Sequence, residues 1–197
     1  MDLIRHADYR RTPWKNGGGE TLEIAVFPAL ADLNNFSWRV SSAHVAASGP
    51  FSLFEGIDRT LMVIGENNLH LRFEQAREVQ LDQSALPFHF SGDEKVVGQL
   101  VNGPVMDLNV MTRRGVARHN VRAISQPGQF EIAGEMALVF SCRNSVRITC
   151  DQKSYRLDAK DSAVLDADFD AVFDVGNYES VPPYDQKLAY LIDIWMV

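Results

Sequence analysis

Short stretches of alternating apolar and polar residues recur along the chain in two successive sets. Residues 58–73 contain two such stretches around a Gly/Asn turn, and residues 135–150 can be laid over them without a gap. Residues 188–197 end the second half as residues 105–111 end the first. A period of two is typical of β-strands, and amphipathic helical patterns are almost absent. The sequence therefore predicts two β-barrels or β-sandwiches of one type, fused in tandem.

Two predicted strands of the first half carry polar residues on one face. Along residues 36–45, alternation separates one face with Arg39, Ser41, Ala43 and Val45 from another with Trp38, Val40, Ser42 and His44. In residues 105–112, one face carries Asp107, Asn109 and Met111. The matching strands of the second half offer mostly Ala, Val, Ile and Leu. We therefore expect a ligand site in the first barrel and a mainly structural second barrel.

A glycine run precedes the first of these strands, in the stretch Pro13-Trp14-Lys15-Asn16-Gly17-Gly18-Gly19-Glu20-Thr21. Glycine adopts positive φ without steric cost, so such a run can turn its N–H groups inward as a nest for an anion. A loop leading into an edge strand is the simpler interpretation. With the strand pattern around it, the run is expected at the rim of the first barrel.

Composition excludes several classes of function. The net charge of −7 and the pI near 5.2 argue against a nucleic-acid or anionic-membrane surface, because both need clustered Lys and Arg. The sequence shows neither a signal-peptide pattern nor an apolar run long enough to span a bilayer, so we expect a cytoplasmic location. Two cysteines, Cys142 and Cys150, are expected to be reduced and packed. The oligomeric state stays open, and a homodimer is compatible with the sequence.

Several motifs occurring in order resemble those of the HutD/Ves family. They are the glycine-run stretch, Trp38-Arg39-Val40-Ser41, Gly49-Pro50-Phe51-Ser52-Leu53-Phe54, Gly56-Ile57-Asp58-Arg59-Thr60 and Asp107-Leu108-Asn109-Val110-Met111-Thr112-Arg113. The resemblance runs from about residue 9 to residue 113 and continues more weakly to the C-terminus. It implies an all-β bicupin, with one cupin-like barrel in residues 1–118 and a second in residues 119–197.

The resemblance also implies a small-molecule-binding role. HutD is associated with histidine utilisation and is proposed to regulate it by binding an intermediate such as formylglutamate. The Ves branch is described as induced by environmental stress. We therefore expect a carboxylate-bearing metabolite as the partner of this chain.

Metal binding is the usual expectation for a cupin-like barrel, because many cupins hold a divalent ion through a His-x-His pair, a Glu and a later His. This sequence has no His-x-His pair, and its five histidines are scattered singly. A metal site needs three or four convergent ligands, so we expect neither a metal nor another cofactor.

Arg39 and Arg59 are the principal candidates for binding a ligand. A guanidinium presents a fixed fork that matches a carboxylate with two hydrogen bonds. The alternative is an ion pair at a strand end, with Asp58 or Glu23 as the partner. Asp107 and Asn109 would orient an arginine or accept from ligand N–H groups, or else form a satisfied polar pair. The full set of expected ligand-binding residues is Lys15, Asn16, Gly17, Gly18, Glu20, Arg39, Ser41, His44, Phe51, Arg59, Asp107 and Asn109.

Two classes of function compete on this sequence. The first is a non-enzymatic binding protein that senses a metabolite and has no catalytic residues. The second is a metal-independent isomerase or hydrolase that uses Lys15, Glu20 or His44 as acid or base. Ser42 and His44 share a strand face, but no motif activates the serine, so nucleophilic catalysis is not expected. An interaction scaffold without a ligand is a third class.

Overall fold

The fold is known from a computed structural model that describes residues 1–150, 152–166, 172–177 and 187–197. Within these residues the chain forms nineteen β-strands and one short 3-10 helix, η1 (His6–Asp8). The all-β prediction is confirmed. In the described part of the chain, no helix is both long enough and apolar enough to cross a membrane.

The described residues divide into two compact units. The first unit is Arg10–Arg118, and the second combines Met1–Tyr9 with His119–Val197. The predicted first barrel, residues 1–118, includes the first nine residues. They belong with the second unit because β1 (Asp2–Ile4) pairs with β17 (Ser162–Asp166), and because Arg5 makes a 2.7 Å ion pair with Asp161.

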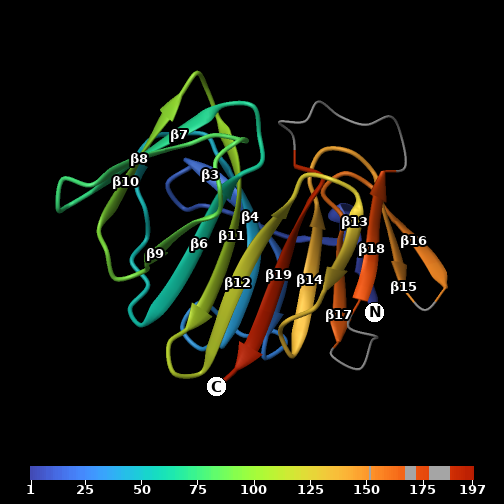
Figure 1. Cartoon of the computed structure of the whole chain (residues 1–197). Coiled ribbons are helices and arrows are strands. Elements are labelled where there is room, and N and C mark those ends of the chain that lie inside the picture. Colours follow the sequence, from blue (N-terminus) through green and yellow to red (C-terminus); the bar gives the residue numbers. More distant parts are fainter. Residues whose placement is uncertain (151, 167–171, 178–186) are drawn as a thin grey trace. The chain divides into compact units, whose positions relative to one another are not determined.

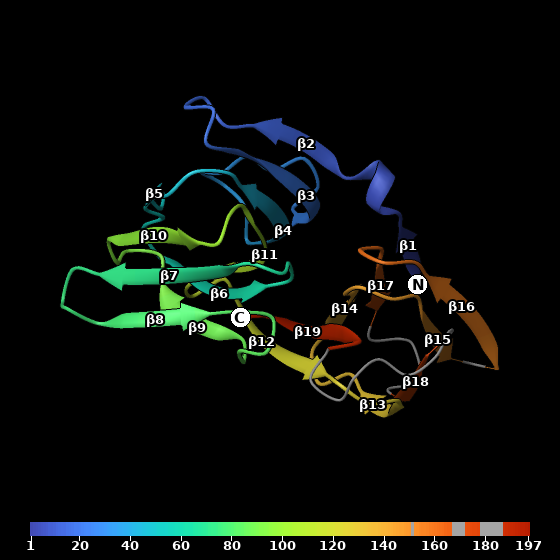
Figure 2. The same ribbon diagram turned by 90° about the horizontal axis from the view of Figure 1, so that it is seen from above.

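The first unit is built from two antiparallel sheets. Their strand orders are β2-β3-β4-β11-β6-β9 and β5-β10-β7-β8, and Figures 1 and 2 both show β7, β8 and β10 side by side. The bounds are β2 (Arg10–Pro13), β3 (Gly19–Phe27), β4 (Trp38–Val45), β5 (Gly49–Pro50), β6 (Ile57–Val63), β7 (Asn68–Phe73), β8 (Glu78–Leu81), β9 (Phe88–Ser91), β10 (Val96–Val101) and β11 (Val105–Arg113).

Apolar side chains from both sheets fill one part of the interior of the first unit. Leu61 and Val63 of β6 pack with Leu69, Leu71 and Phe73 of β7 in a buried cluster. Alternation along β6 places Arg59 on the same face as these two apolar residues. The packed side chains of Leu61 and Val63 thus fix the strand that carries Arg59.

The second unit repeats most of this strand order. Its sheets are β1-β17-β14-β19-β12 and β13-β18-β15-β16. The four-stranded sheet corresponds to β5-β10-β7-β8, and β12, β19, β14 and β17 take the places of β4, β11, β6 and β9. Among the described residues β2 and β3 have no counterpart, and β1 extends the second unit's sheet beyond β17. A buried cluster that includes Ala137, Val139, Val146 and Ile148 forms its core. The remaining bounds are β12 (Ala117–Ile124), β13 (Gly128–Glu131), β14 (Met136–Ser141), β15 (Val146–Cys150), β16 (Lys153–Leu157), β18 (Val172–Asn177) and β19 (Ala189–Met196).

Candidate functional site

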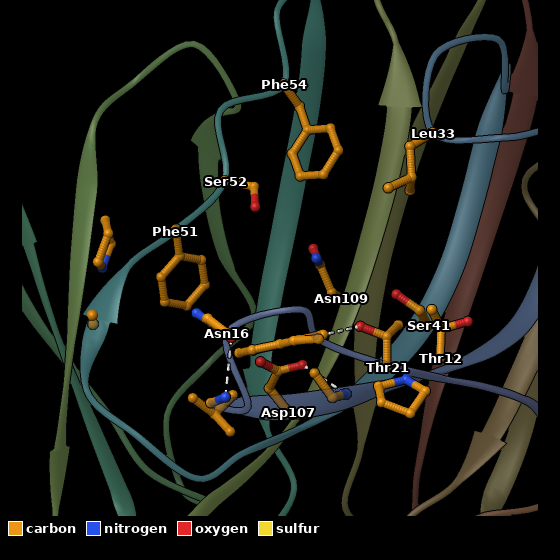
Figure 3. Close-up of a pocket in the computed structure, with 18 of the residues that line it drawn as sticks. Thr12, Asn16, Thr21, Leu33, Ser41, Phe51, Ser52, Phe54, Asp107 and Asn109 are labelled. Atoms are coloured by element: carbon orange, nitrogen blue, oxygen red, sulfur yellow. Dashed lines mark hydrogen bonds between the residues drawn. The ribbon is translucent and has the colours of Figure 1, made fainter.

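A cavity of about 670 Å³ lies within the first unit. Its walls come from β3, β4, β6 and β11, from the hairpin that joins β2 to β3, and from the segment around β5. Figure 3 shows Phe51, Phe54, Asn109 and Asp107 around the same space.

The register of three neighbouring strands builds the polar wall. On β4 and β11, Arg39 pairs with Met111, Ser41 with Asn109, and Ala43 with Asp107. On the other side of β11, Arg59 of β6 also pairs with Met111. Residues two apart on a strand share a face, so these side chains all line the cavity. The two faces predicted for residues 36–45 and 105–112 are confirmed.

Arg59 is buried in an aromatic cage. Only 4% of its surface is exposed, and its guanidinium carbon lies 5.4 Å from the Phe51 ring centroid, 5.4 Å from Phe54 and 5.0 Å from Phe90. Burial lowers the pKa of Arg59 to about 10, while the charge of Asp107 opposes this shift, so the guanidinium is a cation at neutral pH. Among the described residues, its Nε has no hydrogen-bond partner.

Asp107 and Asn109 complete the floor of the cavity beside Arg59. The Oδ1 atom of Asp107 accepts a hydrogen bond from the Ala43 N–H at 3.2 Å. Burial raises the pKa of Asp107 to about 7, and the nearby Arg59 cation limits the rise. The Oδ1 atom of Asn109 is buried and finds no hydrogen-bond partner within the described residues. The cavity thus holds an unpartnered donor, Arg59 Nε, and an unpartnered acceptor.

Arg39 is in a different electrostatic state from Arg59. Its Nε donates to Glu23 at 2.7 Å, and its Nη1 donates to the Ser41 hydroxyl at 3.2 Å. Glu23 makes a second ion pair with Arg10 at 3.0 Å. The ion-pair alternative that the sequence left open for Arg39 is thus the arrangement observed. Arg59, by contrast, is buried and forms no salt bridge with any of the described residues.

The glycine run forms the β2–β3 hairpin at the cavity. The Trp14 indole donates to Thr21 at 2.8 Å, while the Gly17 N–H donates to the Trp14 carbonyl at 3.0 Å. The Gly18 N–H donates to Asn16 Oδ1 at 3.0 Å. Two of the N–H groups that an anion nest would need are therefore used within the turn, and the rim interpretation describes this loop better than the nest does.

Gly19 is required by the close approach of two segments. A Cβ atom there would lie 2.3 Å from the His44 carbonyl oxygen and 3.1 Å from the Trp14 ring. Such contacts are far inside van der Waals range. The position therefore holds the hairpin tightly against β4.

Nine of the twelve expected residues line the cavity: Lys15, Asn16, Gly18, Arg39, Ser41, Phe51, Arg59, Asp107 and Asn109. Gly17, Glu20 and His44 do not line it. Glu20 and His44 are register partners on β3 and β4, and alternation directs both to the opposite face from Ser41. Glu20 instead makes a 3.3 Å ion pair with Arg11.

Several cavity residues were absent from the expected set. Trp14, Thr21, Glu23, Leu33 and Phe54 all line the cavity. Trp14 belongs to the glycine-run motif, and the alternation of β3 could have identified Thr21 and Glu23. Leu33 lies in a loop with no strand pattern, so no periodic signal marks it.

The donor set of the cavity does not suit a divalent transition metal. No histidine or cysteine is among the described residues that line it, and its two carboxylates are Glu23 and Asp107. Glu23 is already engaged with two arginines. Across the described part of the chain, no three His, Cys, Asp or Glu side chains gather as a metal site would require.

The second unit fills the corresponding positions with apolar residues. Equivalent hydrogen bonds run from Ile64 N–H to the Met106 carbonyl and from Cys142 N–H to the Leu188 carbonyl. Counting from these bonds, Arg59 corresponds to Ala137, Asp107 to Ala189 and Asn109 to Leu191. All three counterparts are fully buried in the apolar core of the second unit. The gap-free overlay of residues 135–150 on residues 58–73 was therefore wrong by one residue in its first strand.

Solved structures of low sequence identity share this fold. Protein YlbA from E. coli aligns with a TM-score of 0.63 at 10% identity, over 99% of this chain and 90% of its own. Oxalate decarboxylase from Lactobacillus farciminis aligns with a TM-score of 0.62 at 8% identity, over 98% and 86%. These likenesses concern the fold alone. Together with the walled cavity, they define a cupin-like β protein.

The chain belongs to the HutD family, whose sequence pattern matches residues 6–181. HutD from Pseudomonas fluorescens SBW25 (formate condition) aligns with a TM-score of 0.83 at 28% identity, over 100% of this chain and 98% of its own. An uncharacterized 21.2 kDa protein in the hutC 3' region of Pseudomonas putida is 30% identical over 76% of this chain and 77% of its own. These findings confirm the resemblance seen in the motifs.

The Ves proteins are similar over a shorter stretch. Protein Ves from Citrobacter koseri is 38% identical over 123 residues, which is 60% of this chain and 63% of the Ves protein. The match therefore spans less than two thirds of that relative's length.

Proposed function

We propose that this chain is a non-enzymatic binding protein that holds a small carboxylate-bearing metabolite, such as formylglutamate, in the cavity of its first unit. Through this ligand it would modulate histidine utilisation or a stress response. We further propose that the two units are the two barrels of a bicupin, of which the second is structural. The shared strand order of the units and the apolar counterparts of the cavity residues support that division.

Arg59 carries the proposal. Most arginines in proteins reach water or a carboxylate, because a buried cation without a partner is costly. Here the guanidinium is 4% exposed, faces three aromatic rings, and has a buried Nε without a protein acceptor among the described residues. Within the described residues its guanidinium makes one hydrogen bond, from Nη1 to the Ser52 carbonyl, and that bond is long at 3.5 Å. A small anion would supply the acceptor that the protein does not.

The surroundings of Arg59 suit a carboxylate better than a phosphate. The neighbouring Asp107 opposes a multiply charged anion, and two of the glycine-run N–H groups that would cradle phosphate, those of Gly17 and Gly18, are used within the hairpin. A carboxylate needs only a forked donor and one or two polar neighbours. Arg59 and Asn109 provide these on adjacent strands.

The relatives support a place in histidine utilisation. One is HutD itself, described in a formate condition, and another lies in the hutC 3' region. The similarity to Protein Ves supports the stress-response branch instead. The chemistry of the cavity is the same in either setting.

One observation favours an enzyme as the second candidate. Asp107 lies in the cavity with its pKa raised to about 7, which suits an acid–base catalyst at neutral pH. The residues first considered for that role fit less well, since Glu20 and His44 do not line the cavity. An isomerase or hydrolase would therefore depend on Asp107, with Lys15 near the rim.

Calorimetric titration with formate, formylglutamate and urocanate, alongside turnover assays on the same compounds, separates the candidates. The binding protein predicts saturable binding of at least one acid without turnover. Arg59→Met should weaken that binding by at least about thirtyfold, the effect of removing a buried charge from a hydrogen-bonded pair. Arg72→Met, at an exposed position of β7, is the matched control and should bind as the wild type does. Turnover of any of the three compounds would refute the non-enzymatic proposal.

A further inference from the structure

Six ionisable side chains line the cavity, and three of them form a closed set. Glu23 is paired with Arg39 at 2.7 Å and with Arg10 at 3.0 Å. The others are Lys15, which is exposed, and the buried Arg59 and Asp107. The charge state at the cavity floor therefore depends on Arg59 and Asp107.

Asp107 has few groups to stabilise its negative charge. It lies on β11 between β4, which brings Ala43, Ser41 and Arg39, and β6, which brings Val63 and Arg59. Its carboxylate accepts a hydrogen bond from the Ala43 N–H, and the Arg39 guanidinium is held by Glu23. The side chain is 3% exposed, so water contributes little. Arg59 is thus the principal cation that keeps Asp107 ionised.

An anion bound beside Arg59 would compete with Asp107 for that cation. Two carboxylates that share one buried site cannot both stay ionised, because their repulsion is poorly screened there. One of them takes up a proton from solvent. The Asp is the better acceptor, because burial already raises its pKa to about 7, whereas a simple free carboxylic acid ionises near pH 4.

We infer that Asp107 acts as a neutral carboxylic acid in the complex and donates its hydrogen to the anion held by Arg59, so that ligand binding takes up one proton. This inference rests on the proposed function. No covalent bond forms or breaks other than the O–H bond of Asp107, whose proton comes from solvent. A carboxylic O–H to carboxylate hydrogen bond is short and strong, so Asp107 would become a ligand-binding residue rather than a repulsive one.

This arrangement selects a class of ligand. A monoanionic carboxylate is matched by Arg59 and by the neutral acid. A ligand that presents an ammonium group to the cavity floor would instead keep Asp107 ionised as an ion pair. Such a ligand would bind without taking up a proton.

Formate is the probe for the test, because it stays ionised across the range from pH 6 to pH 8. Calorimetry at pH 8 in two buffers of different ionisation enthalpy counts the protons taken up. With the pKa of Asp107 near 7 in the free protein and well above 8 in the complex, the expected count is about 0.8 to 0.9, and the affinity should fall about tenfold from pH 6 to pH 8. Asp107→Asn should remove both effects, while Glu78→Gln, at an exposed position of β8, should leave both unchanged.

The outcomes separate the inference from the proposed function. Binding of formate by the wild type with no proton uptake would overturn the inference and leave a carboxylate-binding protein. Failure of the wild type to bind formate, formylglutamate or urocanate at any pH would overturn the proposed function itself. The proton count of the wild type decides the matter even where the Asp107→Asn variant does not fold.

Discussion

Replacing Arg59 with Met should make the ligand-free protein more stable while strongly weakening anion binding. Burial lowers the pKa of Arg59 from 12.5 to about 10, and at 1.36 kcal/mol per pKa unit the buried cation costs about 3 kcal/mol at neutral pH. A base whose pKa is lowered in the folded state destabilises the fold at every pH where it is charged, and Arg59 is charged below about pH 10. Met keeps an unbranched apolar chain among the three rings.

The gain is smaller than the full cost of the charge. The guanidinium interacts with the faces of Phe51, Phe54 and Phe90, and losing these contacts forfeits about 1–2 kcal/mol. Asp107 would lose its cation but can become protonated, which limits the penalty at neutral pH. The expected net change is about 1–2 kcal/mol of added stability, or about 2–8 °C in Tm.

Thermal and urea unfolding of the ligand-free wild type and variant provide the assay. Arg72→Met, on an exposed strand position of the same unit, should change the free energy of unfolding by less than about 0.5 kcal/mol. A clear loss of stability in Arg59→Met would refute the reasoning, because it would mean that the cation supports the fold. Arg59 would then have a structural role rather than an anion-binding one.

Two further predictions concern the cavity and its rim. The folded-state pKa of Asp107 is raised from 3.8 to about 7, so its protonation favours the fold. This group should therefore lower the stability of the ligand-free protein by up to about 4 kcal/mol as the pH rises from about 4 to about 7. Urea unfolding of Asp107→Asn should lack that component, and a variant with the same pH profile as the wild type would contradict the assignment. Gly19→Ala should destabilise the protein by about 2 kcal/mol or more, since its Cβ would lie 2.3 Å from the His44 carbonyl oxygen. Gly49→Ala, where a Cβ meets nothing within 4 Å, is the matched control, and equal losses in the two variants would rule out the steric explanation.

Strand alternation predicted much of the polar wall. Arg39, Ser41, Asp107 and Asn109 lie where a period of two places them, because burial of one sheet face fixes the register of every residue on it. The same rule separated His44 from Arg39. His44 was nevertheless included in the expected site, and the structure follows the alternation instead, since His44 does not line the cavity.

The sequence offered Glu23 as an ion-pair partner but did not show that Arg39 is the paired arginine and that Arg59 lies in an aromatic cage. The cage around Arg59 combines Phe51 and Phe54 with Phe90, which is more than thirty positions along the chain. The partner of Arg39 comes from β3 across a bulge near Glu23. Both depend on contacts between strands, which residue periodicity does not specify.

The apolar counterparts in the second unit determine how occupancy of the chain would depend on ligand concentration. Ala137, Ala189 and Leu191 occupy the places of Arg59, Asp107 and Asn109, so the described strands of that unit offer no second copy of the cavity floor. For the ligand proposed above, one such floor among the described strands predicts one ligand per chain. Without a second like site in the chain, occupancy within a single chain would follow a simple hyperbola. A response to ligand concentration steeper than this hyperbola would require assembly of several chains or cooperativity in a downstream partner.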